Sequence, residues 1–306
     1  MLDLDFAFFN MINSDKQGLV YRKFFLDRLA PYLFAPRVEN LINFCGLGLK
    51  GCNMLLPMGQ GNWNLLEADR KKMLLEKSVS ILEDYGLAGM AVDRRLKNEL
   101  LELSNDFPML FGDNFIKALA AVLVKDMISR RRINKLVVAG DFPEMPRFIE
   151  TLKQYDIPVS IQNYRPSQYE IIAYRLLYEK GVAVSTSYIN PQGWEKGDLI
   201  ILFETAANKL ELIAPESFFI DLTADCNSLA PEIGNTLRSR GLDTSIHTVA
   251  PIMESCLWTK AGFWNVDEEQ VNANKDNSFD LVNKWEAIYQ VGEDIGLWDF
   301  FLDKAW

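Results

Sequence analysis

The stretch that decides the fold is Lys135-Leu-Val-Val-Ala-Gly-Asp-Phe-Pro-Glu-Met-Pro-Arg-Phe-Ile-Glu-Thr-Leu152. Its apolar run, residues 136–139, ends at Gly140 and Asp141. From about Pro143 onward, apolar residues recur at helical spacing: Phe148, Ile149 and Leu152. This pattern predicts a buried strand that turns tightly into a helix. Strand–helix units of this kind build α/β domains with a parallel sheet.

The turn after this strand is where a dinucleotide-binding domain carries the motif G-x-G-x-x-G, because the pyrophosphate lies against bare backbone at a helix N-terminus. Here only Gly140 is present, and Phe142 and Pro143 stand where further glycines are expected. Asp141 and Glu144 add carboxylates next to the helix N-terminus, each of which disfavours a bound phosphate by about 0.3–1 kcal/mol. Two interpretations stay open: a dinucleotide site with altered contacts at Gly140, Asp141 and Phe142, or a turn without a ligand.

Composition indicates a globular protein with more than one domain. The chain has 306 residues, 49% of them hydrophobic and 24% charged, which suffices for a large core. A formal net charge of −10 provides no basic surface for nucleic acid or an anionic membrane. We therefore expect a protein that binds neither. Because no apolar run is long enough to span a bilayer, and acids stand near the N-terminus where a secretory signal would have Lys or Arg, we expect the protein to be cytoplasmic. No metal is expected, because there is one histidine and the cysteines are scattered, at Cys45, Cys52, Cys226 and Cys256.

The expected elements divide the chain into three parts. Residues 1–132 are predicted to form a small α/β domain, with helices over the first forty-odd residues and a long connecting helix from 114 to 132. Residues 133–250 alternate strands and helices at short spacing, which predicts a Rossmann-like parallel sheet. Its strands are expected near 136–139, 157–163, 182–184, 198–203, 218–222 and 244–249. Residues 251–306 are predicted to be closing helices that pack back on the N-terminal domain.

In this order of elements the chain resembles the shikimate/quinate dehydrogenase type of two-domain protein, and to some extent the long-chain acyl-carrier-protein reductases. The resemblance implies an NADP or NAD cofactor and a small carbonyl, hydroxy-acid or acyl-thioester substrate in the interdomain cleft. These families usually have G-A-G-G or G-A-T-G where this chain has Gly140-Asp-Phe-Pro143. Asn163-Tyr-Arg-Pro166 is similar, one residue displaced, to their Asn-Arg-Thr, whose arginine binds the 2′-phosphate of NADP. Arg165 is the residue carried over, whereas the Lys/Asp proton-transfer pair of shikimate dehydrogenases has no counterpart.

Two residues are candidate catalytic groups. Cys256, in Glu254-Ser-Cys-Leu-Trp258, lies nearest to the acyl-accepting cysteine that the reductase resemblance implies. A helix N-terminus would favour its thiolate, whereas in a packed position it would be an inert small hydrophobe. His247 is expected to close a strand, where it is either a lone catalytic base or a structural imidazole.

Further polar residues follow the predicted strands at the carboxyl edge of the sheet, where open α/β folds bind ligands. In Glu204-Thr-Ala-Ala207, Thr205 is a candidate cofactor contact. Asp221, Asp225 and Cys226 follow the next strand and would either bind a ligand or cap a helix.

Two functions remain open at this stage. The chain is either an NAD(P)-dependent oxidoreductase-like protein, or a non-catalytic Rossmann-fold binding or assembly protein that has lost dinucleotide binding. A homodimer is left open, because aromatic residues near the C-terminus, Trp298, Phe301 and Trp306, are typical of a core or a dimer interface.

Overall fold

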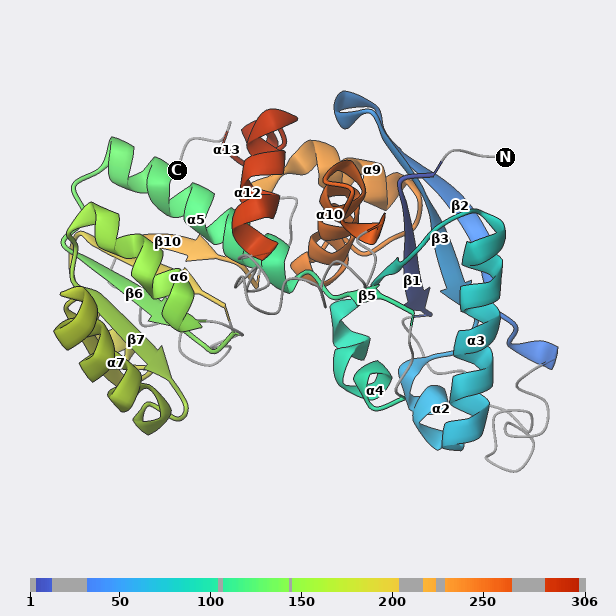
Figure 1. Ribbon diagram of the computed structural model, residues 1–306, viewed down its shortest axis with the longest axis horizontal. Helices are drawn as coiled ribbons and strands as arrows, with labels where there is room; N and C mark the ends of the chain where they lie inside the picture. The colour runs from blue at the N-terminus through green and yellow to red at the C-terminus, as the bar shows by residue number, and fades with distance from the viewer. Residues whose placement is uncertain are drawn as a thin grey trace. The chain divides into compact units, whose positions relative to one another are not determined.

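The computed structural model describes residues 4–12, 32–103, 107–142, 145–203, 217–223, 229–265 and 284–302. The chain divides into two compact units (Figure 1). Unit 1 comprises Met1–Phe115 and Cys226–Phe300, and unit 2 comprises Ile116–Asp225 and Phe301–Trp306. The described residues form a five-stranded sheet in each unit, which confirms the predicted α/β class.

The unit 1 sheet has the strand order β2-β3-β1-β4-β5. Its strands are β1 (Phe6–Met11), β2 (Arg37–Phe44), β3 (Leu49–Leu56), β4 (Met90–Val92) and β5 (Met109–Leu110). The neighbouring strands pair in parallel except β2 and β3, which pair antiparallel. The prediction of helices over the first forty residues is wrong for β1 and for the start of β2. Residues Phe6–Phe9 are buried on both faces of the sheet, so they lack the alternation that marks a half-exposed strand. The second helix expected in that region falls in residues 13–31, outside the described residues.

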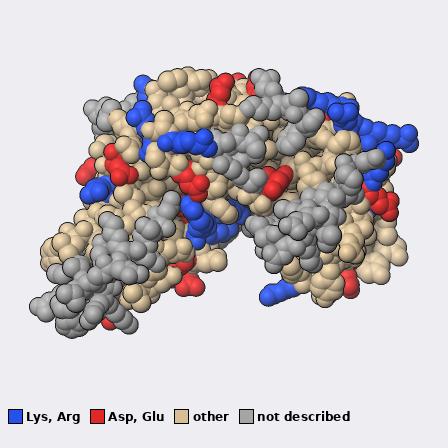
Figure 2. All heavy atoms as spheres, turned by 180° about the vertical axis from the view of Figure 1, so that it is seen from behind, with Lys and Arg blue, Asp and Glu red and all other residues tan. Residues whose placement is uncertain are grey.

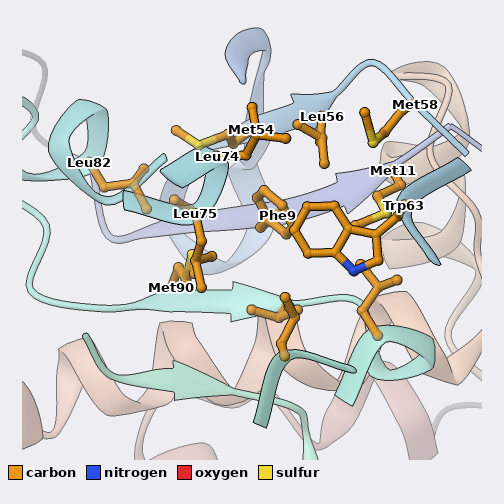
Figure 3. Close-up of a cluster of buried hydrophobic side chains, with 14 of the residues drawn as sticks. Phe9, Met11, Met54, Leu56, Met58, Trp63, Leu74, Leu75, Leu82 and Met90 are labelled. Atoms are coloured by element: carbon orange, nitrogen blue, oxygen red, sulfur yellow. The ribbon is translucent and has the colours of Figure 1, made fainter. Parts of the chain in front are cut away.

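Strand register gives the unit 1 sheet two chemically different faces. On one face, Phe9 stands beside Met54, and both belong to an apolar cluster completed by α2 (Gln60–Leu65) and α3 (Ala68–Asp84). Figure 3 shows Trp63 and the α3 leucines, Leu74, Leu75 and Leu82, against this face. On the other face, Phe8 stands beside Asn53, and Asn10 follows Phe8 by two residues. That face therefore carries two amide side chains among apolar neighbours.

C-terminal helices also pack on the unit 1 sheet. α9 (Pro231–Ser239) contacts β2, and α10 (Ile246–Lys260) contacts β1, β4 and β5. α12 (Lys284–Asp294) packs on α10, and α13 (Asp299–Leu302) follows it. Residues 229–250 therefore belong with unit 1 and not with the Rossmann-like domain, where the sequence placed them. The strand predicted at 244–249 is wrong as well, because α10 begins at Ile246 and its packing overrides the strand preference of its β-branched residues.

The start of α5 (Asp113–Arg130) is held by α10. The carboxylate of Glu254 accepts hydrogen bonds from the backbone N–H groups of Asn114 (3.1 Å) and Phe115 (3.3 Å) and from the Asn114 side-chain amide (2.8 Å). It thereby pairs donors that a helix N-terminus leaves unsatisfied. Gly112, with φ of 84°, precedes the helix. A Cβ atom there would lie 2.6 Å from the Cβ atom of Ala250, so the close approach requires glycine.

The unit 2 sheet is parallel throughout, in the order β10-β9-β6-β7-β8. Its strands are β6 (Lys135–Ala139), β7 (Val159–Asn163), β8 (Val184–Tyr188), β9 (Asp198–Leu202) and β10 (Phe218–Asp221). α6 (Met145–Leu152) connects β6 to β7, and α7 (Ser167–Lys180) connects β7 to β8. These elements confirm the predicted alternation of strands and helices from β6 to β8, and they confirm the strands predicted at 198–203 and 218–222. The strand order reverses between β6 and β9, which is the switch point where such sheets bind ligands.

Unit 2 begins at Ile116 and so takes in most of α5, which the sequence assigned to the first domain as its connecting helix.

Unit 1 also contains the short helix α4 (Lys97–Leu101). Short 3₁₀ turns lie at Cys45–Leu47, Arg94–Leu96, Lys153–Tyr155, Pro191–Gly193 and Phe263–Asn265.

Charged residues of both signs occur on the face drawn in Figure 2. None of the helices in the described ranges combines the length and apolar character that a bilayer crossing would require. Within the same residues, no cluster of three or more His, Cys, Asp or Glu side chains could hold a metal ion.

Candidate functional site

Aromatic rings fill the turn that the sequence marks as the dinucleotide site. Gly140 adopts φ of 109°, a conformation that favours glycine. The buried ring of Phe142 stacks on Phe203, with 4.1 Å between centroids, and meets Phe148 edge-on at 5.4 Å. Because Phe142 follows β6 and Phe203 follows β9, the stacked pair lies at the switch point between these strands. The residues of this turn therefore do not fit a pyrophosphate, which needs bare backbone at that place.

The carboxylate of Asp141 also has a partner within unit 2. It accepts a hydrogen bond from the hydroxyl group of Tyr169, in α7. Asp141 places negative charge near the start of α6, which disfavours a phosphate there. Pro143 and Glu144 lie outside the described residues.

Arg165 lies just beyond the carboxyl end of β7 and is exposed. Its backbone N–H donates to Oδ1 of Asn163 at 2.9 Å, and this turn orders the chain before α7. Thr205, the other predicted cofactor contact, lies outside the described residues, as do Asp225 and Cys226. Asp221 accepts hydrogen bonds from the backbone N–H (2.8 Å) and hydroxyl group (2.6 Å) of Thr223, which supports a structural role for its carboxylate.

Both predicted catalytic residues belong to α10 in unit 1, whereas Gly140, Asp141, Phe142 and Arg165 belong to unit 2. Cys256 is fully buried in the interior of α10 and not at its N-terminus. Burial raises the pKa of its thiol well above the usual value, so the thiolate needed for nucleophilic attack is disfavoured. His247 lies in the first turn of α10 and not at a strand end.

Unit 1 has a recess lined by polar side chains, and we call it the unit 1 pocket. It opens near the carboxyl ends of β1, β3 and β4 and consists of two adjoining cavities of about 230 and 360 Å³. Both cavities are lined by Asp93 and Arg95. Asn10, Asn53, Glu39 and Asp243 line the smaller one, and Gln60 and Asn64 line the larger one. None of these residues was predicted as a site residue.

Asp93 and Arg95 form a fixed charged pair in this pocket. The guanidinium group donates through Nε and Nη2 to the two carboxylate oxygens of Asp93, at 2.9 and 2.6 Å. The Arg95 backbone N–H also donates to Asp93, at 2.9 Å, and Nη1 lies 3.2 Å from a carboxylate oxygen of Asp243. The hydrogen bonds with Asp93 raise the pKa of Arg95 against the effect of its burial, and Asp93 and Asp243 raise it further by charge. Two carboxylates thus already neutralise the cation of the pocket.

Two amide oxygens face the opposite situation. The side chain of Asn53 is almost fully buried, and its amide nitrogen donates to Oε2 of Glu39 at 3.3 Å. Its Oδ1, like Oδ1 of Asn10, is buried without a hydrogen-bond partner among the described residues. A buried acceptor without a donor costs about 1–3 kcal/mol. Such atoms in a pocket wall indicate that a ligand or water supplies the missing donor.

His247 lies in the electrostatic field of the same charged group. Burial lowers the pKa of its imidazole, as do the cations Arg95 and Arg94, whereas Asp93 and Asp243 act in the opposite direction. The net shift is downward, so the imidazole is neutral near pH 7. Its Nδ1 is buried without a hydrogen-bond partner in the described part of the chain.

A sequence signal for this pocket exists, although it was missed. In Phe6-Ala-Phe-Phe-Asn10 and in Gly89-Met-Ala-Val-Asp93, a polar residue ends an apolar run, and Asn53 interrupts a third run. Once each run is recognised as a strand, the three residues gather near one end of a parallel sheet. Because the first run was predicted to be helical, β1 was not counted among the strands whose ends meet at this edge of the sheet.

No family model and no curated protein matches the chain. Solved structures that match include an L-tryptophan dehydrogenase from Nostoc punctiforme, with 10% identity and a TM-score of 0.41 over 81% of this chain and 73% of that one. A shikimate 5-dehydrogenase-like protein matches with 12% identity and a TM-score of 0.36, over 95% of this chain and 99% of the other. Shikimate 5-dehydrogenase from Thermus thermophilus, in complex with NADP(H) and shikimate, matches with 12% identity and a TM-score of 0.33, over 94% and 99%.

These matches include the dehydrogenase type that the sequence resembles. At such identities and TM-scores they say nothing about what this chain binds, which must come from its own residues.

Proposed function

We propose that this chain is an oxidoreductase-like protein that binds a small polar molecule in the unit 1 pocket. The observation that carries the proposal is the buried Oδ1 of Asn53, a residue that lines the smaller cavity; this oxygen has no donor in the described structure. A bound molecule with a hydrogen-bond donor would satisfy it. The fixed pair of Asp93 and Arg95 supplies a preorganised charged wall beside it.

For unit 2 we propose a nicotinamide dinucleotide, NADP or NAD, held at the carboxyl ends of the parallel strands. The position of Arg165 after β7 and the reversal of strand order between β6 and β9 support this proposal. The turn after β6 does not fit a pyrophosphate, so the contacts of the phosphates would differ from the glycine-rich type. Fold analogy alone does not fix the activity. The predicted position of a ligand between the domains stays a prediction.

A second candidate function is that of a binding protein without a dinucleotide. The stacked rings of Phe142 and Phe203 favour it, because they take up the place of the pyrophosphate with buried apolar surface. In this case unit 2 would have a structural role, and the unit 1 pocket alone would bind ligand.

Isothermal titration calorimetry with NADPH and NADH separates the two functions. The oxidoreductase-like function requires binding of one dinucleotide to the wild-type protein, and weaker binding to Arg165→Ala. Arg175→Ala is the matched control, because Arg175 is also an exposed arginine of unit 2 but lies within α7. If neither dinucleotide binds at millimolar concentration, the second candidate stands and the cofactor proposal fails.

A further inference from the structure

The charges that line the smaller cavity of the unit 1 pocket favour a cation. Three carboxylates line it, those of Glu39, Asp93 and Asp243, against the single guanidinium group of Arg95 among the described lining residues. That guanidinium already pairs with Asp93 and Asp243. An anionic ligand would therefore meet a net negative charge, and the described wall has no cation that is not already paired. Electrostatic complementarity thus disfavours an anionic ligand.

Two buried acceptors of the wall lack a donor in the described part of the chain. Oδ1 of Asn53 and Oδ1 of Asn10 both lack a donor among the residues that the structure describes. The orientation of the Asn53 amide follows from its neighbour, because only the nitrogen can donate to the carboxylate of Glu39. The oxygen of Asn53 is therefore the atom left for a ligand. A ligand that satisfies both amides has to bring donors, and an ammonium group brings three donors and no acceptor.

The spacing of the two amides asks for two donor groups. Asn53 pairs with Phe8 in the register of β1 and β3, so Asn10 lies two residues further along the neighbouring strand. With about 3.3 Å per residue along a strand and about 4.8 Å between strands, the two Cα atoms are about 8 Å apart. A molecule with two separated donor groups matches two residues at this spacing. A metal ion is disfavoured, because the described carboxylates form no metal-binding cluster.

From these observations we propose that the unit 1 pocket binds a small primary amine that carries a neighbouring hydroxyl group, with the ammonium group near Glu39 and Asn53. The proposal rests on the ligand pocket of the proposed function and names its ligand class. It is independent of the dinucleotide, so that loss of NADPH and NADH binding would leave it intact.

Three probes of nearly equal size test the charge preference: 2-aminoethanol, ethylene glycol and glycolate. Each is titrated at neutral pH into the full-length ¹⁵N-labelled protein, and the side-chain amide resonances of Asn10 and Asn53 report binding. We expect 2-aminoethanol to shift both resonances with an affinity about tenfold or more above that of ethylene glycol, because hydrogen bonds from a charged donor are stronger. Glycolate is expected to leave both resonances in place.

Glu39→Gln provides the matched test of the partner. It keeps the shape of the side chain and removes its charge, and Glu39 is exposed, so folding is not expected to change. The affinity for 2-aminoethanol should fall by about tenfold. Glu76→Gln, an equally exposed carboxylate on α3, should leave it unchanged.

Three results overturn the inference: tighter binding of glycolate than of 2-aminoethanol, no shift of either amide by any probe, or equal losses in the two variants. Glycolate binding at these amides would refute the ligand class while retaining the pocket. An absence of all binding would refute the pocket as well.

Discussion

Phe142→Ala tests whether aromatic rings close the switch point of unit 2. Phe142 is 8% exposed and contacts two rings, Phe203 at 4.1 Å and Phe148 at 5.4 Å between centroids. Truncating a buried phenylalanine to alanine costs about 3–5 kcal/mol of stability. Each aromatic pair contributes about 0.5–1.5 kcal/mol of this, in addition to the burial of the ring. We therefore expect Phe142→Ala to lower the free energy of unfolding by about 3–5 kcal/mol. Phe142→Leu, which retains most of the apolar volume, should lower it by about 1–2 kcal/mol.

Urea denaturation followed by circular dichroism measures both variants, and hydrogen exchange at the β6 amides assigns the loss to unit 2. A double-mutant cycle of Phe142→Leu and Phe203→Leu should give a coupling free energy of about 0.5–1.5 kcal/mol. The control is Tyr174→Leu, since Tyr174 stacks on Tyr178 at the exposed surface of α7, and it should change stability by less than about 0.5 kcal/mol.

The reasoning is refuted if Phe142→Ala lowers the free energy of unfolding by less than about 1 kcal/mol, as a substitution at an exposed or tolerant position does. The ring would then not be packed at the switch point, and the turn would be open to a phosphate.

Three further predictions concern unit 1. Gly112→Ala should destabilise the protein by about 2–5 kcal/mol in thermal or urea unfolding, because left-handed strain adds to a steric clash with α10. Gly48→Ala, with φ of 63° and nothing within 4 Å of the added Cβ atom, should cost only about 1–2 kcal/mol, and equal costs would contradict the close contact. Burial raises the pKa of Glu254 above 4.5, so the ionised carboxylate is disfavoured in the folded state. The folded protein therefore loses stability as the pH rises from the unfolded-state pKa of this group through its folded-state pKa. In urea titrations, the free energy of unfolding of Glu254→Gln minus that of the wild type should therefore increase with rising pH. A decrease of this difference with rising pH would refute the raised pKa of Glu254. Peptide mapping after treatment with a thiol reagent should find Cys45, which is exposed, modified well before buried Cys256; equal rates would show that α10 opens readily.

The order of elements in unit 2 could be predicted from the sequence because local signals agree there. The strands β6, β9 and β10 are short, mostly apolar runs, and the turn residues Gly140 and Gly181 mark the end of β6 and of α7. Those positions have positive φ in the structure, as the turn chemistry requires. Parallel pairing then follows from the alternation itself.

The fold of unit 1 was harder to predict, for two physical reasons. β1 is buried on both faces, so Phe6–Phe9 shows no period that distinguishes a strand from a helix. At the other end of the chain, Ile246 and Val249 favour a strand by intrinsic preference, but packing against the sheet makes them the beginning of α10. The pocket was missed as a consequence, since it is assembled from the ends of strands that are far apart in sequence.

A comparison of the polar groups in the two units supports unit 1 as the place of the small-ligand pocket proposed above. In unit 2, the strand-end carboxylates have partners within the unit, Asp141 with Tyr169 and Asp221 with Thr223. In unit 1, the amide oxygens of Asn10 and Asn53 have none in the described structure. Two such acceptors would cost the folded protein about 2–6 kcal/mol if nothing paired them, a large fraction of the roughly 5–15 kcal/mol by which a domain is usually stable. A ligand that pairs both would recover this free energy, so its binding should raise the stability of unit 1 in particular.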